Sequence, residues 1–150
     1  MTTWRFLEDA GGWDLIWFAV DDDGHVAAVT TAGFTLLPDF VTSIDLFNDL
    51  FDVVEKLPGR GNARAMQDLD EALRYDSWED LAVRGLYTYD MEQDDGDGPT
   101  RLVLRAVYFP STALHLIDLP QNARDLLEAC RLPGVLFAST PVLRVDEPPR

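Results

Sequence analysis

Two apolar runs joined by a strong turn signal constrain the fold of this chain more than any other feature. Residues 13–20 are mostly aromatic, aliphatic or β-branched, and residues 25–31 form a second run of strand type. Between them, residues 21–24 read Asp-Asp-Asp-Gly, and both residue types accept the backbone angles of tight turns. The sequence therefore predicts a β-hairpin over residues 13–31. Its first strand is expected either to be covered on both faces or to lie centrally in the sheet, because residues 15–18 are all apolar.

Helical and extended patterns follow in the rest of the chain. The clearest helix is predicted at residues 43–57, where apolar side chains recur every three or four residues, Ser43 stands at the N-cap position and Pro58 ends the pattern. Shorter helices are predicted at residues 63–74, 77–83 and 119–130. Strands are predicted at residues 85–91 and 101–109, and edge strands at 135–138 and 142–145.

This order of elements predicts an α+β fold. It lacks the regular alternation of strand and helix that builds a parallel sheet, so we expect an antiparallel sheet of about five strands with the helices packed on one side. The chain has 150 residues, of which 47% are apolar, enough for the core of one ordinary domain. We predict a single domain over residues 1–145 and a flexible C-terminal tail over residues 146–150.

The charge of the chain is strongly negative and unevenly distributed. Asp and Glu outnumber Lys and Arg by 27 to 12, and residues 6–55 contain eleven carboxylates and no lysine or arginine. A field of this sign repels nucleic acid and anionic membranes and attracts basic proteins. The longest apolar runs also fall far short of the roughly 20 residues of a membrane-spanning helix. We therefore expect a basic protein partner, and binding neither to nucleic acid nor to membranes.

Three acidic segments are candidates for the partner-binding surface. The helix at residues 43–57 places its carboxylates on the arc opposite its apolar side chains, with no lysine between them to offset their repulsion. The turn at residues 21–24 and the loop at residues 92–99 add further acids. The predicted partner-binding residues are Asp21, Asp22, Asp23, Asp45, Asp49, Asp52, Glu55, Asp94, Asp95 and Asp97. The alternative is that these acids only keep the protein soluble.

No motif in the sequence predicts catalysis, a metal or a cofactor. The acidic segments at residues 21–25 and 90–97 lack the ligand spacing of a calcium loop. Residues 59–64 place glycines and two arginines before a predicted helix, which favours either an anion site or a flexible link. Cys130 falls at an inward helical position, typical of a core residue. No nucleophile elbow accompanies His25 or His115.

Two other functions remain compatible with the sequence. The first is a small-ligand or metal-dependent enzyme whose site lies in a crevice between sheet and helices, with polar groups such as His25, His115 or Tyr89. The second is an accessory protein that self-associates through exposed aromatic residues such as Trp4 and Trp13. A single cysteine permits no intrachain disulfide, and the first residues do not form a signal peptide, so we expect a cytoplasmic protein.

Two stretches of the chain are similar to known proteins. Residues 17–33 (WFAVDDDGHVAAVTTAG) and residues 84–90 (RGLYTYD) resemble small bacterial proteins that are encoded beside polymorphic toxins as their immunity partners. The resemblance covers about a sixth of the chain, 24 of its 150 residues, and transfers no individual site residue. It implies a cytosolic, non-enzymatic binding protein that occludes a toxin, often a basic nuclease.

Overall fold

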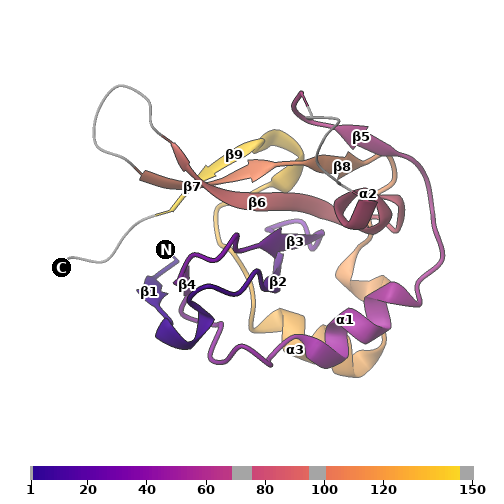
Figure 1. The fold of residues 1–150 in the computed structure, drawn as a ribbon. Helices are drawn as coiled ribbons and strands as arrows, with labels where there is room; N and C mark the ends of the chain where they lie inside the picture. Colours follow the sequence, from indigo (N-terminus) through magenta and orange to yellow (C-terminus); the bar gives the residue numbers. More distant parts are fainter. Residues whose placement is uncertain (1, 69–75, 95–100, 146–150) are drawn as a thin grey trace.

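The computed structural model describes residues 2–68, 76–94 and 101–145, and it has an α+β fold with one five-stranded sheet and two small two-stranded sheets (Figure 1). The strand order of the large sheet is β2-β3-β6-β7-β9, and β1 pairs with β4 and β5 with β8. The strands are β1 (Trp4–Phe6), β2 (Ile16–Val20), β3 (Val26–Thr30), β4 (Leu36–Pro38), β5 (Ala63–Ala65), β6 (Tyr87–Asp94), β7 (Arg101–Ala106), β8 (Tyr108–Pro110) and β9 (Val142–Arg144). The helices are α1 (Asn48–Glu55), α2 (Asp76–Val83) and α3 (Gln121–Glu128), with 3-10 turns η1 (Glu8–Ala10), η2 (Leu116–Asp118) and η3 (Phe137–Ser139).

The predicted hairpin is confirmed and lies at one edge of the large sheet. Strands β2 and β3 pair antiparallel, from Ile16 opposite Thr30 to Val20 opposite Val26. The strand residues that follow Ile16 in β2 are all buried, as the continuous apolar run predicts. On one face of the strand the Trp17 ring contacts Trp4 and Phe40, and on the other Phe18 packs against Phe47.

The large sheet is mixed, so the prediction of a purely antiparallel sheet is wrong. Strand β6 pairs parallel to β3, with Ala27 opposite Tyr87 and Thr30 opposite Asp90. The long connection between them contains α1 and α2 and returns the chain in its original direction, which is what a parallel pair requires. The other three pairings of this sheet are antiparallel.

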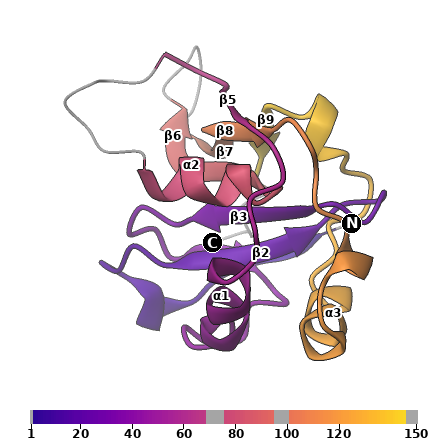
Figure 2. The ribbon, with the colours of Figure 1, turned by 90° about the vertical axis from the view of Figure 1, so that its right-hand side faces the viewer.

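The helices flank different parts of the sheet. Helix α2 contacts β5, β6 and β8, whereas α3 contacts β2. Figure 2 shows α1 and α3 on the same side of the β2–β3 hairpin, with α2 across it. Packing of all helices on one side of the sheet stays a prediction.

Several predicted boundaries are wrong for reasons of tertiary packing. Helix α1 begins at Asn48, and Ser43 does not cap it, because Phe47 occupies the N-cap position while its ring is buried against Phe18. Residues 63–65 form β5 instead of opening a helix, since they pair with β8; residues 69–74 of that prediction lie outside the described residues. Residues 135–138 form no strand, and the turn η3 begins at Phe137. Strands β1 and β4 were not predicted.

The other predicted elements are present with shifted ends. Helices α2 and α3 confirm the predictions at residues 77–83 and 119–130, and β9 confirms an edge strand within residues 142–145. Strand β6 extends three residues beyond the predicted end at residue 91, because residues 92–94 pair with β7. The predicted strand at residues 101–109 is divided between β7 and β8. The predicted tail at residues 146–150 lies outside the described residues.

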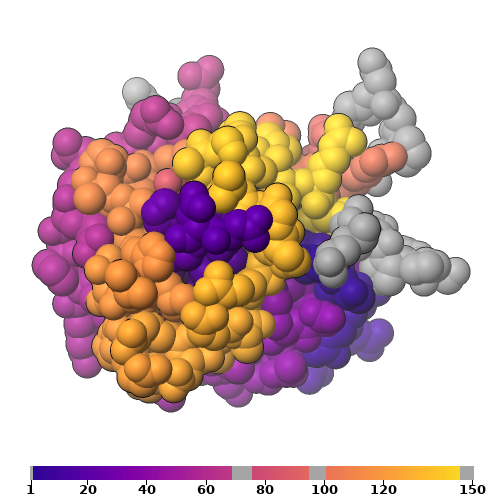
Figure 3. Space-filling model, turned by 180° about the vertical axis from the view of Figure 1, so that it is seen from behind, coloured from indigo at the N-terminus to yellow at the C-terminus, as the bar shows by residue number. Residues whose placement is uncertain are grey.

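A buried carboxylate joins the hairpin turn to the C-terminal part of the chain. Asp21 is only 1% exposed. Its Oδ1 accepts hydrogen bonds from the backbone N–H groups of Asp23 (3.0 Å) and His25 (2.9 Å), and its Oδ2 accepts one from the N–H of Phe137 (3.0 Å). Figure 3 shows the early, indigo-coloured turn segment surrounded by the orange and yellow segments of the last third of the chain. The expectation that Asp21 presents its carboxylate to a partner is therefore wrong.

We expect Asp21→Ala to destabilise the protein strongly. The substitution leaves three backbone N–H groups without their acceptor, and each unsatisfied buried group costs about 1–3 kcal/mol. The free energy of unfolding, measured by urea denaturation, should fall by at least about 3 kcal/mol. Asp23→Ala is the matched control, because Asp23 is exposed in the same turn and surface substitutions usually change stability by about 0.5 kcal/mol or less. Equal losses in both variants would contradict a structural role of the Asp21 carboxylate.

Candidate functional site

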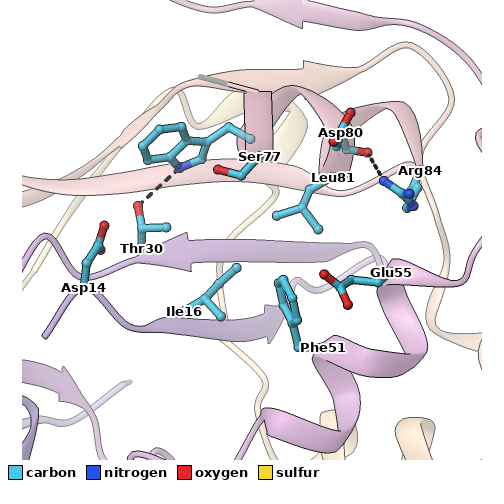
Figure 4. A pocket seen from close by; sticks show the side chains of 10 residues that line it. Asp14, Ile16, Thr30, Phe51, Glu55, Ser77, Asp80, Leu81 and Arg84 are labelled. Carbon is cyan, nitrogen blue, oxygen red and sulfur yellow. Dashed lines mark hydrogen bonds between the residues drawn. The ribbon is translucent and has the colours of Figure 1, made fainter. Parts of the chain in front are cut away.

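A cleft lies between α1, α2 and the open end of the β2–β3 hairpin (Figure 4). Its volume is about 530 Å³, which falls in the range of sites that bind small ligands or side chains of a partner. Strands and the segment before β2 supply one wall, and the two helices supply the others. The lining residues are Asp14, Ile16, Thr30, Phe51, Glu55, Ser77, Trp78, Asp80, Leu81 and Arg84.

The floor of the cleft is apolar. Ile16 and Thr30 face it as a cross-strand pair at the end of the hairpin. Phe51 reaches it from the apolar face of α1, and Trp78 and Leu81 reach it from α2 at positions three residues apart. Such spacing places side chains on the same face of a helix. The amphipathic pattern of both helices therefore positions the floor.

A chain of hydrogen bonds leads from the cleft into the sheet. The Trp78 indole Nε1–H donates to Oγ1 of Thr30 (3.2 Å), and the Thr30 hydroxyl donates to Oδ1 of Asp90 (2.5 Å). Asp90 is the parallel neighbour of Thr30 on β6. Thr30 thus joins α2 to two adjacent strands and fixes the orientation of the indole ring that lines the cleft.

The Asp90 carboxyl holds its proton more tightly than an ordinary aspartate. Burial, together with the negative charges of Asp14 and Glu92, raises its pKa to about 6, although hydrogen bonds with Thr30 and the backbone of Met91 act in the opposite direction. Asp90 is therefore ionised at neutral pH at a cost to the folded state and protonated under mildly acidic conditions.

Carboxylates dominate the rim of the cleft. Asp14, Glu55 and Asp80 line it, and Arg84 is the one cation among the described lining residues. The Arg84 guanidinium donates from Nε to the carbonyl of Leu57 (3.1 Å) and from Nη1 to the carbonyl of Asp80 (3.0 Å). Figure 4 shows Asp14 and Arg84 at opposite ends of the cleft. The two ends are therefore electrostatically different, one purely acidic and one mixed.

A second hollow continues the cleft along α1. It has a volume of about 320 Å³ and shares Asp14, Ile16 and Phe51 with the first. On its far side it reaches Ile44 and Asp52. Asp52 and Glu55 of α1 therefore border the same continuous surface as the cleft.

The predicted partner-binding residues divide among several places. Asp45, Asp49, Asp52 and Glu55 are exposed on α1 or just before it, and Glu55 lines the cleft. Asp22 is exposed in the hairpin turn, where its carboxylate accepts from the N–H of Gly134 (3.1 Å), and Asp23 is exposed beside it. Asp94 ends β6, at the end of the sheet away from α1 (Figure 1). Asp95 and Asp97 lie outside the described residues.

Sequence reasoning missed Asp14, Trp78, Asp80 and Arg84 as members of one site. The spacing of Trp78 and Leu81 could have indicated an inward face of α2. Nothing in the sequence connects Asp14 with α2, because the two segments meet only through the crossover between β3 and β6.

The polar residues expected for an enzyme site lie elsewhere. The His25 and His115 rings stand 6.0 Å apart, at an isolated bridge beside the hairpin turn, and His115 Nδ1 accepts from the N–H of Ile117 (3.1 Å). Tyr89 is buried in the core and donates its hydroxyl to the carbonyl of Thr140 (2.8 Å). A crevice between sheet and helices is present, but none of these three residues lines it.

The other candidate sites are occupied by structural contacts. Cys130 is buried in the core, as predicted, and this burial raises the pKa of its thiol to about 12. Arg60 forms an ion pair with Asp118 (3.2 Å). Residues 63–65 form a strand, so residues 59–64 do not precede a helix N-terminus, and the interpretation as an anion site of that kind is wrong. Trp4 is 5% exposed, whereas Trp13 is 63% exposed.

Comparisons with models of protein families, with curated protein sequences and with solved structures find no match to this chain. Within the described residues, no helix has the length and apolar character needed to cross a membrane. The same residues contain no group of three or more His, Cys, Asp or Glu side chains arranged to hold a metal ion.

We expect Asp90→Asn to stabilise the protein at neutral pH and to have little effect in acid. The folded pKa of Asp90 lies above that of an unfolded aspartate, so its favourable contribution is complete below about pH 4 and is lost as the pH rises through about 6. Asparagine carries no charge and still accepts from Thr30. The gain in the free energy of unfolding should be on the order of 1 kcal/mol at pH 7.5, since partial exposure screens the carboxylate.

The measurement is urea denaturation of both proteins between pH 4 and pH 8. Asp9→Asn serves as the control, because it removes an exposed carboxylate on η1. A difference between wild type and Asp90→Asn that does not grow over this pH range would contradict the assignment.

Proposed function

We propose that this protein is a non-catalytic acidic binding protein whose partner is a basic protein. In its most specific form, the partner is a toxin, such as a basic nuclease, that the protein occludes as an immunity protein in the cytoplasm. The observation that carries the proposal is the continuous acidic face formed by α1 and the adjoining cleft.

The charges of this face are not neutralised within the part of the chain that the structure describes. The ion pairs of arginine with carboxylates in that part join Arg60 with Asp118, Arg105 with Glu92 and Arg131 with Glu128. None of them involves Asp45, Asp49, Asp52 or Glu55. Exposed like charges one turn apart repel each other by a few tenths of a kcal/mol, and a basic partner would remove this cost on binding.

An apolar component accompanies the charge. Ile44 is 39% exposed at the end of the second hollow, and Trp13 precedes the rim residue Asp14. Interfaces commonly combine a few exposed aromatic or aliphatic anchors with a polar rim. Ile44 gives the α1 face an exposed aliphatic side chain beside its carboxylates, which favours protein binding over a role of the acids in solubility alone.

We expect reversal of charge on α1 to weaken capture of the basic partner. The Asp45→Lys/Asp49→Lys variant should bring down at least about five-fold less of a basic protein from an extract of the source organism at low salt, because both steering and contact are lost. The captured protein is identified and quantified by mass spectrometry.

The control is Glu8→Lys/Asp9→Lys, which makes the same change of net charge on η1. Near-native circular dichroism and urea midpoints are required of both variants. If the two variants reduce capture equally, or if 0.5 M salt releases nothing, the α1 face is not the binding surface.

A further inference from the structure

We propose that the cleft receives an arginine side chain of the basic partner, with the guanidinium at the Asp14 end and the methylene stem on the apolar floor. This inference rests on the proposed function and specifies which chemistry of the partner the protein recognises. It follows from the shape of the cleft, the charges at its two ends and the aromatic side chain beside the acidic end.

The two ends of the cleft select the position of a cation. At one end the fixed guanidinium of Arg84 opposes a second positive charge, although Glu55 and Asp80 are nearby. At the other end Asp14 is exposed and accepts one hydrogen bond, from the backbone N–H of Ala32 (3.1 Å), through its Oδ1. Within the described residues, no lysine or arginine forms an ion pair with Asp14. An incoming cation is therefore most favourable beside Asp14.

The aromatic and aliphatic walls suit arginine in particular. The Trp78 indole donates a hydrogen bond to the Thr30 hydroxyl (3.2 Å), and Thr30 lies beside Asp14 in Figure 4. A planar guanidinium can donate two hydrogen bonds to one carboxylate such as that of Asp14, which a lysine ammonium cannot do with the same geometry. Ile16, Phe51 and Leu81 supply the apolar surface on which an arginine stem rests.

The cleft also has an entry for the chain that carries this arginine. The second hollow opens from the same residues, Asp14, Ile16 and Phe51, toward Ile44. An apolar residue next to the arginine in the partner can occupy that hollow. The surface thus fits a short segment with one arginine beside one aliphatic or aromatic residue.

The direct test is a titration with two capped dipeptides, N-acetyl-Leu-Arg-amide and N-acetyl-Leu-citrulline-amide, which have the same shape and differ in charge. Binding is followed by two-dimensional proton–nitrogen NMR, with the Trp78 indole N–H assigned through Trp78→Phe. The arginine peptide should shift this resonance and those around the cleft in a saturable manner, and the citrulline peptide should bind at least about five-fold more weakly. Equal binding of the two peptides, or no binding by the arginine peptide, would overturn the inference.

Two neutralised carboxylates serve as a matched pair. Asp14→Asn should raise the dissociation constant of the arginine peptide at least about five-fold, whereas Asp39→Asn, an exposed site outside the cleft, should change it less than two-fold. Equal effects of the two substitutions would show that only net charge matters, and would also overturn the inference.

A variant that fills the cleft separates this inference from the proposed function. Ser77→Trp places a large side chain at the exposed lining position of α2 and leaves every carboxylate of α1 in place. It should abolish the dipeptide shifts and reduce capture of the partner. If capture requires the α1 carboxylates but is unchanged by Ser77→Trp, the arginine inference fails and the proposed function stands. If the dipeptide binds as expected and no basic partner is captured, only the proposed function fails.

Discussion

The rest of the structure depends on the three hydrogen bonds that the buried Asp21 carboxylate accepts from backbone N–H groups. Two of them close the turn between β2 and β3, and the third holds η3 at Phe137. Near this turn, Val20 also exchanges backbone hydrogen bonds with Cys130 and Leu132. A segment from the first quarter of the chain is thereby joined to a segment from its last quarter. The same contacts cover the edge strand β2 at its C-terminal end. A carboxylate so placed serves the fold.

At the other end of the same hairpin, Thr30 has the corresponding role for the cleft. Its hydroxyl accepts from the Trp78 indole and donates to Asp90, so α2, β3 and β6 meet at one side chain. This arrangement fixes the aromatic wall of the cleft and places a carboxyl of raised pKa directly beneath it. The proposed arginine site is thus built where α2 meets two paired strands of the sheet, with Asp14 supplied by the segment that leads into β2.

Local patterns predicted well those elements in which the physical cause is local. The hairpin at residues 13–31 was predictable because its turn residues and apolar runs are adjacent in the chain, and α2 and α3 because their apolar spacing is complete within one segment. The start of α1 was not predictable from a local pattern. Phe47 lies at the N-cap position, and its ring packs against Phe18, which is distant in the sequence. Strand β5 was not predictable either, because Ala63–Ala65 are extended through their pairing with β8, which lies more than 40 residues later in the chain.

The same distinction applies to function. The sequence by itself determined the negative charge and the exposed acidic arc of α1, because charge and helical periodicity are properties of the chain alone. Only the tertiary structure decided that Asp21 is internal while Asp14, Trp78 and Arg84 border one cleft. The physical reason is the parallel pairing of β3 with β6, which requires a long crossover and brings α1 and α2 against the end of the hairpin. No local pattern encodes that return of the chain.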